Sequence, residues 1–405
     1  MSEQVQQKQA GKFQVASAAT PDCGRLFPET ELVSQSTLDD ISASRIKQPN
    51  EQSNSEISGA QMQTSKAPCA ASTTVSVVVP CFNEERFIGK VLENLAQQYD
   101  GEKYEIIVVD GMSTDRTREV VAEFATRKAS DVRVRLIDNP ARNIPVALNT
   151  GIKEARGEII VRMDAHSVPS INYVRRCVEL LNEQEAAVVG MPWRIRPGEE
   201  SCVARAVALA VSHPFGIGDA KYRSPNIHGA QFVDTVPFGV FRKSLWQELG
   251  GFNENLLANE DYDFNYRVRE RGGRILLDAS EHCDYFARST MTELAKQNFR
   301  YGSWKAQMVK LHPRSIKLRQ LVAPVFVAAL VVLATLSLWW MPALWLLSAI
   351  VALYTSLAIL CAVQLARRSG EGFDLKLVAA ISLAFFVIHS FWGSGFLSGL
   401  TRTPR

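Results

Sequence analysis

The sequence lacks three features that would place it in large classes of protein. Its 45 Lys and Arg nearly balance its 42 Asp and Glu, so there is no excess of positive charge of the kind that binds nucleic acid.

Its seven cysteines are scattered and odd in number, with no close pair at metal-ligand spacing. A reduced, cytosolic environment is the simpler interpretation. No G-x-G-x-x-G segment follows the first predicted strand, which counts against a dinucleotide-dependent dehydrogenase.

Residues 1–72 lack any sustained apolar period and are rich in Ser, Gln, Ala, Glu and Thr. Such a segment buries too little apolar surface to offset its chain entropy, so we predict a disordered N-terminal extension. It also lacks the apolar core that a signal peptide needs, which argues against secretion by that route.

Long apolar stretches are confined to the last quarter of the chain. Leu321–Leu365 is almost wholly apolar and has room for two membrane passes of roughly 20 residues each. Met341-Pro342 is the predicted break, because proline suits the start of a helix and not its interior. A third run, Leu377 to about Leu400, fits a third span, a re-entrant segment or an interfacial helix. We assign residues 320–400 to a membrane region with two or three transmembrane helices.

Basic residues flank the first two apolar stretches on both sides. They are Lys310, Arg314, Lys317 and Arg319 before the first, and Arg367, Arg368 and Lys376 after the second. Because Lys and Arg accumulate in cytoplasmic loops, both flanks are predicted to be cytoplasmic. The domain that precedes them is then cytoplasmic as well.

Between these regions, short apolar strands alternate with amphipathic helices. The predicted strands are Val75–Val79, Glu105–Val109, Val132–Ile137 and Glu158–Met163. Helices are expected from Glu84 onward, after Ser113-Thr114-Asp115, and from Pro145. This alternation is typical of a mostly parallel sheet with helices on both faces. We therefore predict an α/β domain over residues 73–310.

Polar side chains and a proline stand where three of these strands end. Pro80, Asp110 and Asp164 each follow a strand directly, and ligands of open α/β sheets lie beyond the carboxyl ends of the strands. Asp110 is suited to accept hydrogen bonds from a base or ribose, while Asp115 is the expected helix cap. Glu84 is either a further ligand contact or a carboxylate that a helix N-terminus favours.

Asp164-Ala165-His166 is a candidate metal site. Two ligand side chains with one residue between them can converge on a divalent cation, and a hard oxygen with a neutral imidazole suits Mn²⁺. The alternative is a strand-end Asp followed by a loop His.

Two later segments also carry chemistry. Asn259-Glu260-Asp261 precedes a predicted helix, where adjacent carboxylates are either caps or groups that face a cleft. In Gln297-Asn298-Phe299-Arg300-Tyr301, the Arg300 guanidinium is suited to clamp phosphate oxygens. The alternative for this segment is an interfacial amphipathic helix with aromatic and basic anchors.

In this order along the chain, the segments resemble those of a family 2 glycosyltransferase with the GT-A fold, an inverting sugar transferase. More narrowly, they are similar to the succinoglycan-type exopolysaccharide glucosyltransferases of bacteria. The resemblance covers about Val75 to Lys310 and extends into the membrane region. The segments that carry it are Val78–Glu85, Val108–Asp115, Arg162–His166, Val233–Arg242 and Asn259–Phe264.

The resemblance implies a UDP-sugar donor, with glucose as the expected sugar, and a role for each motif residue. The donor contacts it implies are Pro80, Phe82, Glu84, Asp110, Asp164, Gln297 and Arg300. Asp164 and His166 would hold Mn²⁺ or Mg²⁺ against the diphosphate, although His166 stands where the family usually has a second Asp. Because an inverting transferase needs a base for the acceptor hydroxyl, Asp261 is the expected catalytic base, with Glu260 second.

The implied acceptor is a polyprenyl-diphosphate-linked oligosaccharide at the cytoplasmic face of a bacterial inner membrane, with an exopolysaccharide assembly complex as a potential partner. Tyr301 stands where processive synthases carry Trp, and the tail is short, so we favour addition of one sugar over processive polymerisation. The remaining alternative is an inactive, membrane-anchored scaffold that binds sugar nucleotides. The intact Asp110, Asp164 and Asp261 argue against it.

Overall fold

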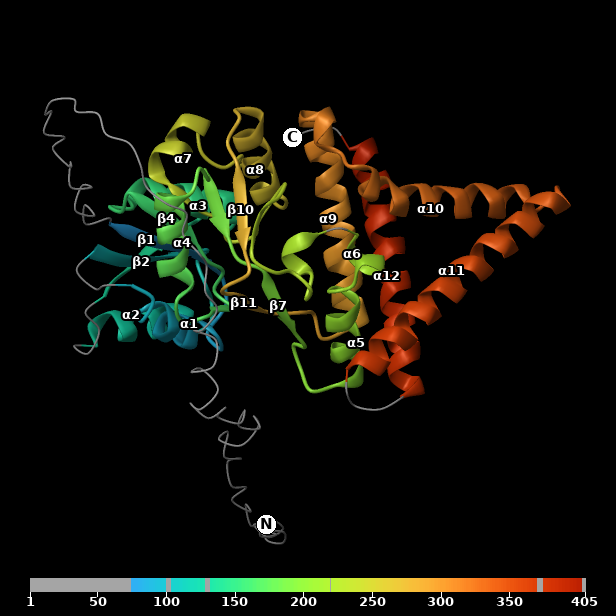
Figure 1. The fold of residues 1–405 in the computed structure, drawn as a ribbon, viewed down its shortest axis with the longest axis horizontal. Helices are drawn as coiled ribbons and strands as arrows, with labels where there is room; N and C mark the ends of the chain where they lie inside the picture. The colour runs from blue at the N-terminus through green and yellow to red at the C-terminus, as the bar shows by residue number, and fades with distance from the viewer. Residues whose placement is uncertain (1–73, 100–102, 128–131, 219, 370–373, 403–405) are drawn as a thin grey trace, which may run out of the picture. The chain divides into compact units, whose positions relative to one another are not determined.

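The computed structural model describes residues 74–99, 103–127, 132–218, 220–369 and 374–402 (Figure 1), all within one compact unit, Pro68–Arg405. The predicted disordered extension at residues 1–72 lies outside the described residues.

An eight-stranded, mostly parallel sheet forms the centre of the α/β domain. Its strand order is β3-β2-β1-β4-β9-β6-β10-β8, with β8 and β9 antiparallel to their neighbours. The strands are β1 Val75–Cys81, β2 Tyr104–Asp110, β3 Arg133–Asp138, β4 Ile159–Arg162, β6 Val188–Gly190, β8 Ala230–Phe232, β9 Val240–Arg242 and β10 Ile275–Asp278. The first four confirm the strands predicted from the sequence. The later strands were not predicted.

A three-stranded sheet adjoins the carboxyl end of β4. It has the order β5-β11-β7, with strands β5 Ser167–Pro169, β7 Trp193–Arg196 and β11 Cys283–Phe286. Strands of three or four residues are too short to show a periodic pattern, which is why the sequence did not predict them.

Helices cover both faces of the large sheet, as predicted, because successive side chains of a strand point to opposite faces. The helices of one face are α1 Ile88–Leu95, α2 Thr117–Thr126 and α4 Tyr173–Glu183. Those of the other face are α3 Ile144–Glu154, α7 Lys243–Leu249 and α8 Glu260–Glu270. In β1, Val77 and Val79 pack with α1, α2 and α4, whereas Val78 packs with α3 and α8.

The first helix begins later than predicted. Helix α1 starts at Ile88, not at Glu84, because the residues before it are bonded to the loop after β2. The backbone N–H of Asn83 donates to the Ser113 hydroxyl at 2.8 Å, and that of Glu84 donates to the Thr117 hydroxyl at 2.7 Å. These hydrogen bonds replace the helical ones at this point.

Three helices near the end of the chain are long and apolar enough to cross a membrane: α10 Leu318–Leu336, α11 Met341–Arg368 and α12 Leu375–Thr401. The break between the first two falls at Met341-Pro342, as predicted. Only 6% of the most apolar window of α10 and 11% of that of α11 is buried, against 39% for α12. Helix α12 is therefore partly a packing element of the α/β domain.

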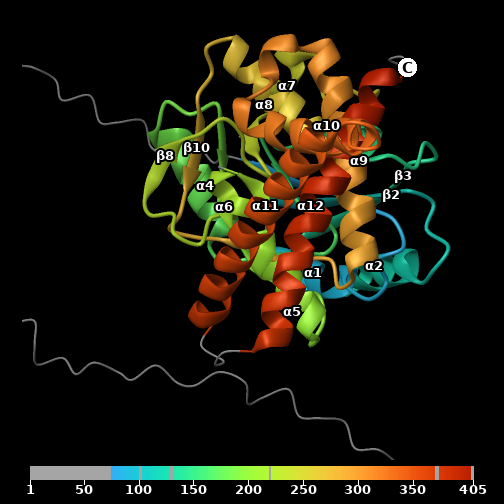
Figure 2. The ribbon, with the colours of Figure 1, turned by 90° about the vertical axis from the view of Figure 1, so that its right-hand side faces the viewer.

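Helix α12 packs along α9, Met291–Leu311, and α5, Cys202–Ala210 (Figures 1 and 2). Small residues allow the close approach. A Cβ on Gly302 of α9 would collide with the Trp392 carbonyl oxygen, and one on Gly395 of α12 would collide with the Phe299 carbonyl oxygen. A Cβ on Gly399 would lie 2.5 Å from the Ser303 carbonyl oxygen. Glycines on both helices thus join the third apolar run to α9.

We predict that Gly395→Leu and Gly302→Leu each separate α9 from α12. An added side chain would meet backbone, which cannot move aside cheaply, so the expected cost is about 1–3 kcal/mol of stability. Thermal unfolding of the detergent-solubilised protein measures it. Gly89→Ala is the control, because its Cβ would meet only a Val120 methyl at 3.4 Å. An equal melting temperature for Gly395→Leu and the control would contradict this packing.

Candidate active site

The loops after β1 and β2 are hydrogen-bonded to each other and form one edge of the candidate site. Asn83 Oδ1 accepts from the backbone N–H of Thr114 at 2.8 Å, and Asp115 Oδ2 accepts from that of Glu85 at 3.2 Å. Asp115 also accepts from the backbone N–H of Thr117, the first residue of α2, at 3.0 Å. Asp115 thus binds the first turn of α2 from one residue before the N-cap, which is Arg116 and not the predicted Asp115. The two segments predicted to contact the nucleotide lie together.

Asp110 is fully buried at the end of β2, and its carboxylate has partners within the protein. Oδ2 accepts from the backbone N–H of Ser113 at 2.9 Å and from Nη1 of Arg118 at 2.7 Å. Arg118 also donates to Asp138, at the end of β3, at 2.8 Å. In this structure Asp110 orders the turn after β2. Its predicted contact with a nucleotide requires an exchange of these partners.

Phe82 presents an accessible aromatic ring at the same edge, just beyond β1, in which Pro80 lies. The side chain is 49% exposed, and the Arg142 guanidinium lies 6.0 Å from the centroid of its ring. A Cβ at Gly111 would lie 3.3 Å from the ring. An open aromatic face beside a cation has the chemistry to stack on a base and to attract phosphate.

Glu84 and His166, which were predicted separately, are partners. Nδ1 of His166 lies 2.9 Å from Oε1 of Glu84. Burial lowers the pKa of His166, but the hydrogen bond to Glu84 and the charge of Asp164 outweigh it, and the pKa is raised. The pairing fixes the imidazole orientation and leaves Nε2 as the ring nitrogen that a metal ion would use.

Arg162, the last residue of β4, is the charged centre of the site. Its guanidinium lies 3.0 Å from Oε1 of Glu260 and 3.3 Å from Oδ1 of Asp164, and it contacts Oδ2 of Asp261. Only 5% of its side chain is exposed. Burial disfavours the charged form, yet the three carboxylates raise the pKa of Arg162. Sequence reasoning gave Arg162 no role, although a cation inside an apolar strand was a signal.

Asp261, the expected base, lies in the first turn of α8 beside this arginine. Asn259, which precedes α8, has a positive φ of 65° and donates through Nδ2 to the Tyr301 carbonyl oxygen at 3.2 Å. Burial has the largest effect on Asp261 and raises its pKa to about 7, although Arg162 opposes the rise. The side chain keeps 25% of its surface exposed. An accessible carboxylate that titrates near neutrality suits general base catalysis.

Gln297 joins α9 to an aromatic cluster of the small sheet. Its Nε2 donates to the hydroxyl groups of Tyr285 at 3.3 Å and of Tyr301 at 3.4 Å. The Tyr285 ring stacks on Trp193, with centroids 4.1 Å apart, and the Arg223 guanidinium lies 5.0 Å from the Trp193 ring. Aromatic faces suit the apolar faces of sugars. The sequence carried no motif for Trp193, Tyr285 or Arg223, because they lie in short, irregular elements.

Arg300, predicted with Gln297, lies one turn further along α9. It lines a cavity between α9 and α12, which Gln297 does not line. The predicted donor contact of Arg300 stays a prediction.

The candidate metal ligands fit a cation that is completed by other ligands. Within the described residues, no three His, Cys, Asp or Glu side chains converge as a preformed metal site. Asp164 keeps 23% of its side chain exposed, and His166 keeps 34%. A carboxylate with an oriented imidazole supplies two ligands for Mn²⁺ or Mg²⁺, and oxygen atoms of a bound diphosphate would have to supply others.

The central α/β sheet carries ligand-type residues at the ends of its parallel strands, where ligands bind in open α/β folds. Residues 76–249 match the family model "Glycosyl transferase family 2". The chain therefore carries a family 2 glycosyltransferase domain over residues 76–249.

Named relatives agree with this assignment. The succinoglycan biosynthesis protein ExoA of Rhizobium meliloti is 28% identical over 335 residues, which cover 80% of this chain and 94% of that protein. A dolichyl N-acetyl-alpha-D-glucosaminyl phosphate 3-beta-D-2,3-diacetamido-2,3-dideoxy-beta-D-glucuronosyltransferase of Methanococcus voltae is 27% identical over 58% of this chain and 74% of that protein.

A solved structure shows the same fold. It is the mannosyltransferase PcManGT from Pyrobaculum calidifontis in complex with GDP-Man and Mn²⁺, with a TM-score of 0.51 and 20% identity. The match covers 78% of this chain and 86% of that one.

Replacing Arg162 by Met would leave three clustered carboxylates without their cation. We expect a loss of about 3 kcal/mol, the lower end for a broken buried pair, because Asp164 and Asp261 stay partly exposed. Arg116→Met is the control, since Arg116 and Glu119 form an exposed ion pair whose loss should leave stability unchanged. Thermal unfolding compares the two. Equal melting temperatures would remove Arg162 from the centre of this account.

Proposed function

We propose that this chain is an inverting glycosyltransferase. It would transfer a sugar, with glucose as the expected one, from a UDP-sugar to a polyprenyl-diphosphate-linked oligosaccharide in exopolysaccharide biosynthesis. The observation that carries the proposal is Asp261, an accessible carboxylate with a pKa raised to about 7, held by Arg162 next to the candidate metal ligands. The name of the Rhizobium relative supports polysaccharide synthesis, and that of the Methanococcus relative supports a lipid-phosphate acceptor.

In the proposed reaction, Oδ of Asp261 removes the proton of an acceptor hydroxyl. The hydroxyl oxygen forms a bond to the anomeric carbon from one face, while the bond from that carbon to the diphosphate oxygen breaks on the other. The nucleoside diphosphate leaves, and Asp261 holds the proton. Arg162 positions Asp261 and limits the rise of its pKa.

Asp164 and Nε2 of His166 would hold the divalent cation, with Glu84 orienting the imidazole. A bound cation would stabilise the charge on the leaving diphosphate. PcManGT supports such a donor and ion in this fold, because it was solved with GDP-Man and Mn²⁺.

For the membrane, we propose that α10 and α11 cross and that α12 lies at the interface. Helix α9 carries Lys296, Arg300, Lys305 and Lys310, which are costly at the bilayer centre. Because α12 is joined to α9 through glycines, the two helices have to lie at a similar depth. Helix α10 projects crosswise from α12 and is seen nearly end-on in Figure 2. The α/β domain, residues 73–310, would then lie in the cytoplasm at a bacterial inner membrane.

We predict that kcat/KM rises with pH and levels off above an apparent pKa near 7. Asp261 must be deprotonated to accept a proton, so activity is lost as pH falls through its pKa. Asp261→Asn should lower kcat by roughly 10²–10⁴-fold and remove this pH dependence, with donor binding retained. Sugar transfer from labelled UDP-glucose, measured from pH 5.5 to 9, tests this. Glu270→Gln, at the exposed end of the same helix, is the control. A wild-type rate for Asp261→Asn would exclude it as the base.

A second prediction concerns Glu84. Glu84→Gln keeps the shape of the side chain but weakens its hydrogen bond to His166, so the Mn²⁺ concentration for half-maximal activity should rise by about 10–100-fold. Glu85→Gln is the matched control, because Glu85 bonds Arg116 instead. Mn²⁺ titration of chelator-treated membranes measures both. An unchanged Mn²⁺ requirement in Glu84→Gln would show that the Glu84–His166 pair does not support a metal ion.

A further inference from the structure

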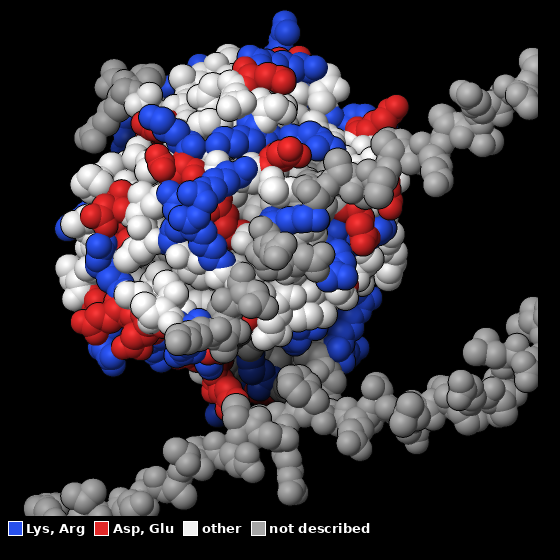
Figure 3. Space-filling model, turned by 90° about the vertical axis from the view of Figure 1, so that its left-hand side faces the viewer, with Lys and Arg blue, Asp and Glu red and all other residues white. Residues whose placement is uncertain are grey.

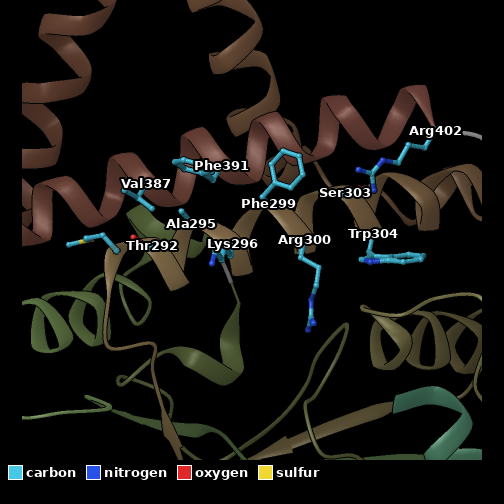
Figure 4. A pocket seen from close by; sticks show the side chains of 11 residues that line it. Thr292, Ala295, Lys296, Phe299, Arg300, Ser303, Trp304, Val387, Phe391 and Arg402 are labelled. Atoms are coloured by element: carbon cyan, nitrogen blue, oxygen red, sulfur yellow. Dashed lines mark hydrogen bonds between the residues drawn. The ribbon is translucent and has the colours of Figure 1, made fainter. Parts of the chain in front are cut away.

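A cavity of about 630 Å³ lies between α9 and α12, apart from the cluster around Arg162 (Figure 4). It is lined by residues of α9, of α12 and by Arg402, which follows α12. The residues that matter here are Lys296, Arg300 and Trp304 of α9, Val387 and Phe391 of α12, and Arg402. We name it the α9–α12 groove.

The charges along the groove have one sign. Three of its lining residues are cations, and none of its described lining residues is a carboxylate. Within the described chain, Lys296 and Arg300 have no ion-pair partner, whereas Arg162 and Arg118 have several. Elsewhere on the surface, on the face in Figure 3, Lys and Arg lie interspersed with Asp and Glu. Such an uncompensated set of cations attracts an anion with several oxygens.

The rest of the groove is apolar. Phe299 and Phe391 line it together with Val387, and Phe391 remains 41% exposed. An exposed apolar wall next to cations is amphipathic, so it fits neither a free inorganic anion nor a wholly apolar ligand. In Figure 4, Phe391 and Val387 extend from α12, while Arg300 and Lys296 extend from α9 toward the α/β domain.

The groove is also connected to the candidate base through a single helix. Tyr301, next to Arg300, accepts through its carbonyl oxygen from Asn259, which begins the helix that carries Asp261. Gln297, three residues before Arg300, bonds the aromatic cluster at Tyr285. Arg300 therefore lies on the helix that is hydrogen-bonded to the start of α8, which carries Asp261.

We propose that the α9–α12 groove binds the lipid end of the acceptor: the phosphate groups at Lys296 and Arg300, and the first isoprenoid units against Phe299, Val387 and Phe391. This assigns Arg300 to the acceptor in place of the donor contact expected from the sequence. The assignment rests on the proposed lipid-linked acceptor. The charge complementarity and the position of α9 and α12 at the membrane surface favour a lipid phosphate over a soluble one.

The test is binding, not transfer. Full-length protein in phosphatidylcholine nanodiscs is titrated with undecaprenyl phosphate, and retained lipid is measured by native mass spectrometry. We expect one equivalent to be retained and Lys296→Gln/Arg300→Gln to weaken binding by at least tenfold. Val387→Trp, which fills the groove without changing charge, should weaken it similarly. Arg367→Gln/Lys376→Gln, which changes two cations outside the groove, should bind as wild type does.

Three results would overturn the inference. One is unchanged binding in both groove variants. Another is equal retention of phosphatidylglycerol, which would make the groove a general anionic-lipid site. The third is displacement by inorganic phosphate, which would make it a free-anion site. Because the assay needs no donor, lipid binding together with a failed transfer reaction would count against the proposed function, and the groove would then be a lipid-phosphate site without an acceptor role.

Discussion

The buried guanidinium of Arg162 is the interaction on which the rest of the site depends. It lies at the end of the central strand β4, where it meets carboxylates from two parts of the chain, Asp164 just after the strand and Glu260 and Asp261 on α8. Without it, three negative charges would share a poorly solvated space, which is costly. With it, the pKa of Asp261 is about 7 and the side chain remains accessible. A structural ion pair thereby fixes the place and the chemistry of the candidate base.

Helix α9 extends this arrangement toward the membrane. Its residues are hydrogen-bonded to Asn259 and to the Tyr285 cluster, pack on α12 through glycines, and line the groove. Its buried Lys305 lies 3.7 Å from the Tyr262 ring centroid, and burial lowers the pKa of this lysine to about 7. Because α9 makes packing contacts and hydrogen bonds with several elements, it is a rigid link between the α/β domain and the apolar helices. Donor and acceptor sites would then keep a fixed separation.

Sequence patterns predicted the parts that local physics determines. Four apolar strands and the helix break at Met341-Pro342 follow from the apolar period and from proline geometry. The pairing of Glu84 with His166 and the role of Arg162 did not follow, because Glu84 and His166 are 82 positions apart and Arg162 and Asp261 are 99 positions apart. The packing of α12 on α9 was not predicted, because only the structure of the partner helix shows what the glycines of α12 contact. The predicted start of α1 at Glu84 was wrong, because hydrogen bonds to the loop after β2 replace the first helical turn.

The stereochemistry of the transferred sugar tests the central claim most directly. The account holds that one carboxylate base directs a single displacement at the anomeric carbon. The product formed from α-linked UDP-glucose by membranes that contain the protein can be isolated, and its anomeric configuration determined by proton NMR. The account predicts a β-glycoside, the inverted configuration. An α-glycoside would show retention and would contradict a mechanism built on Asp261 as the base.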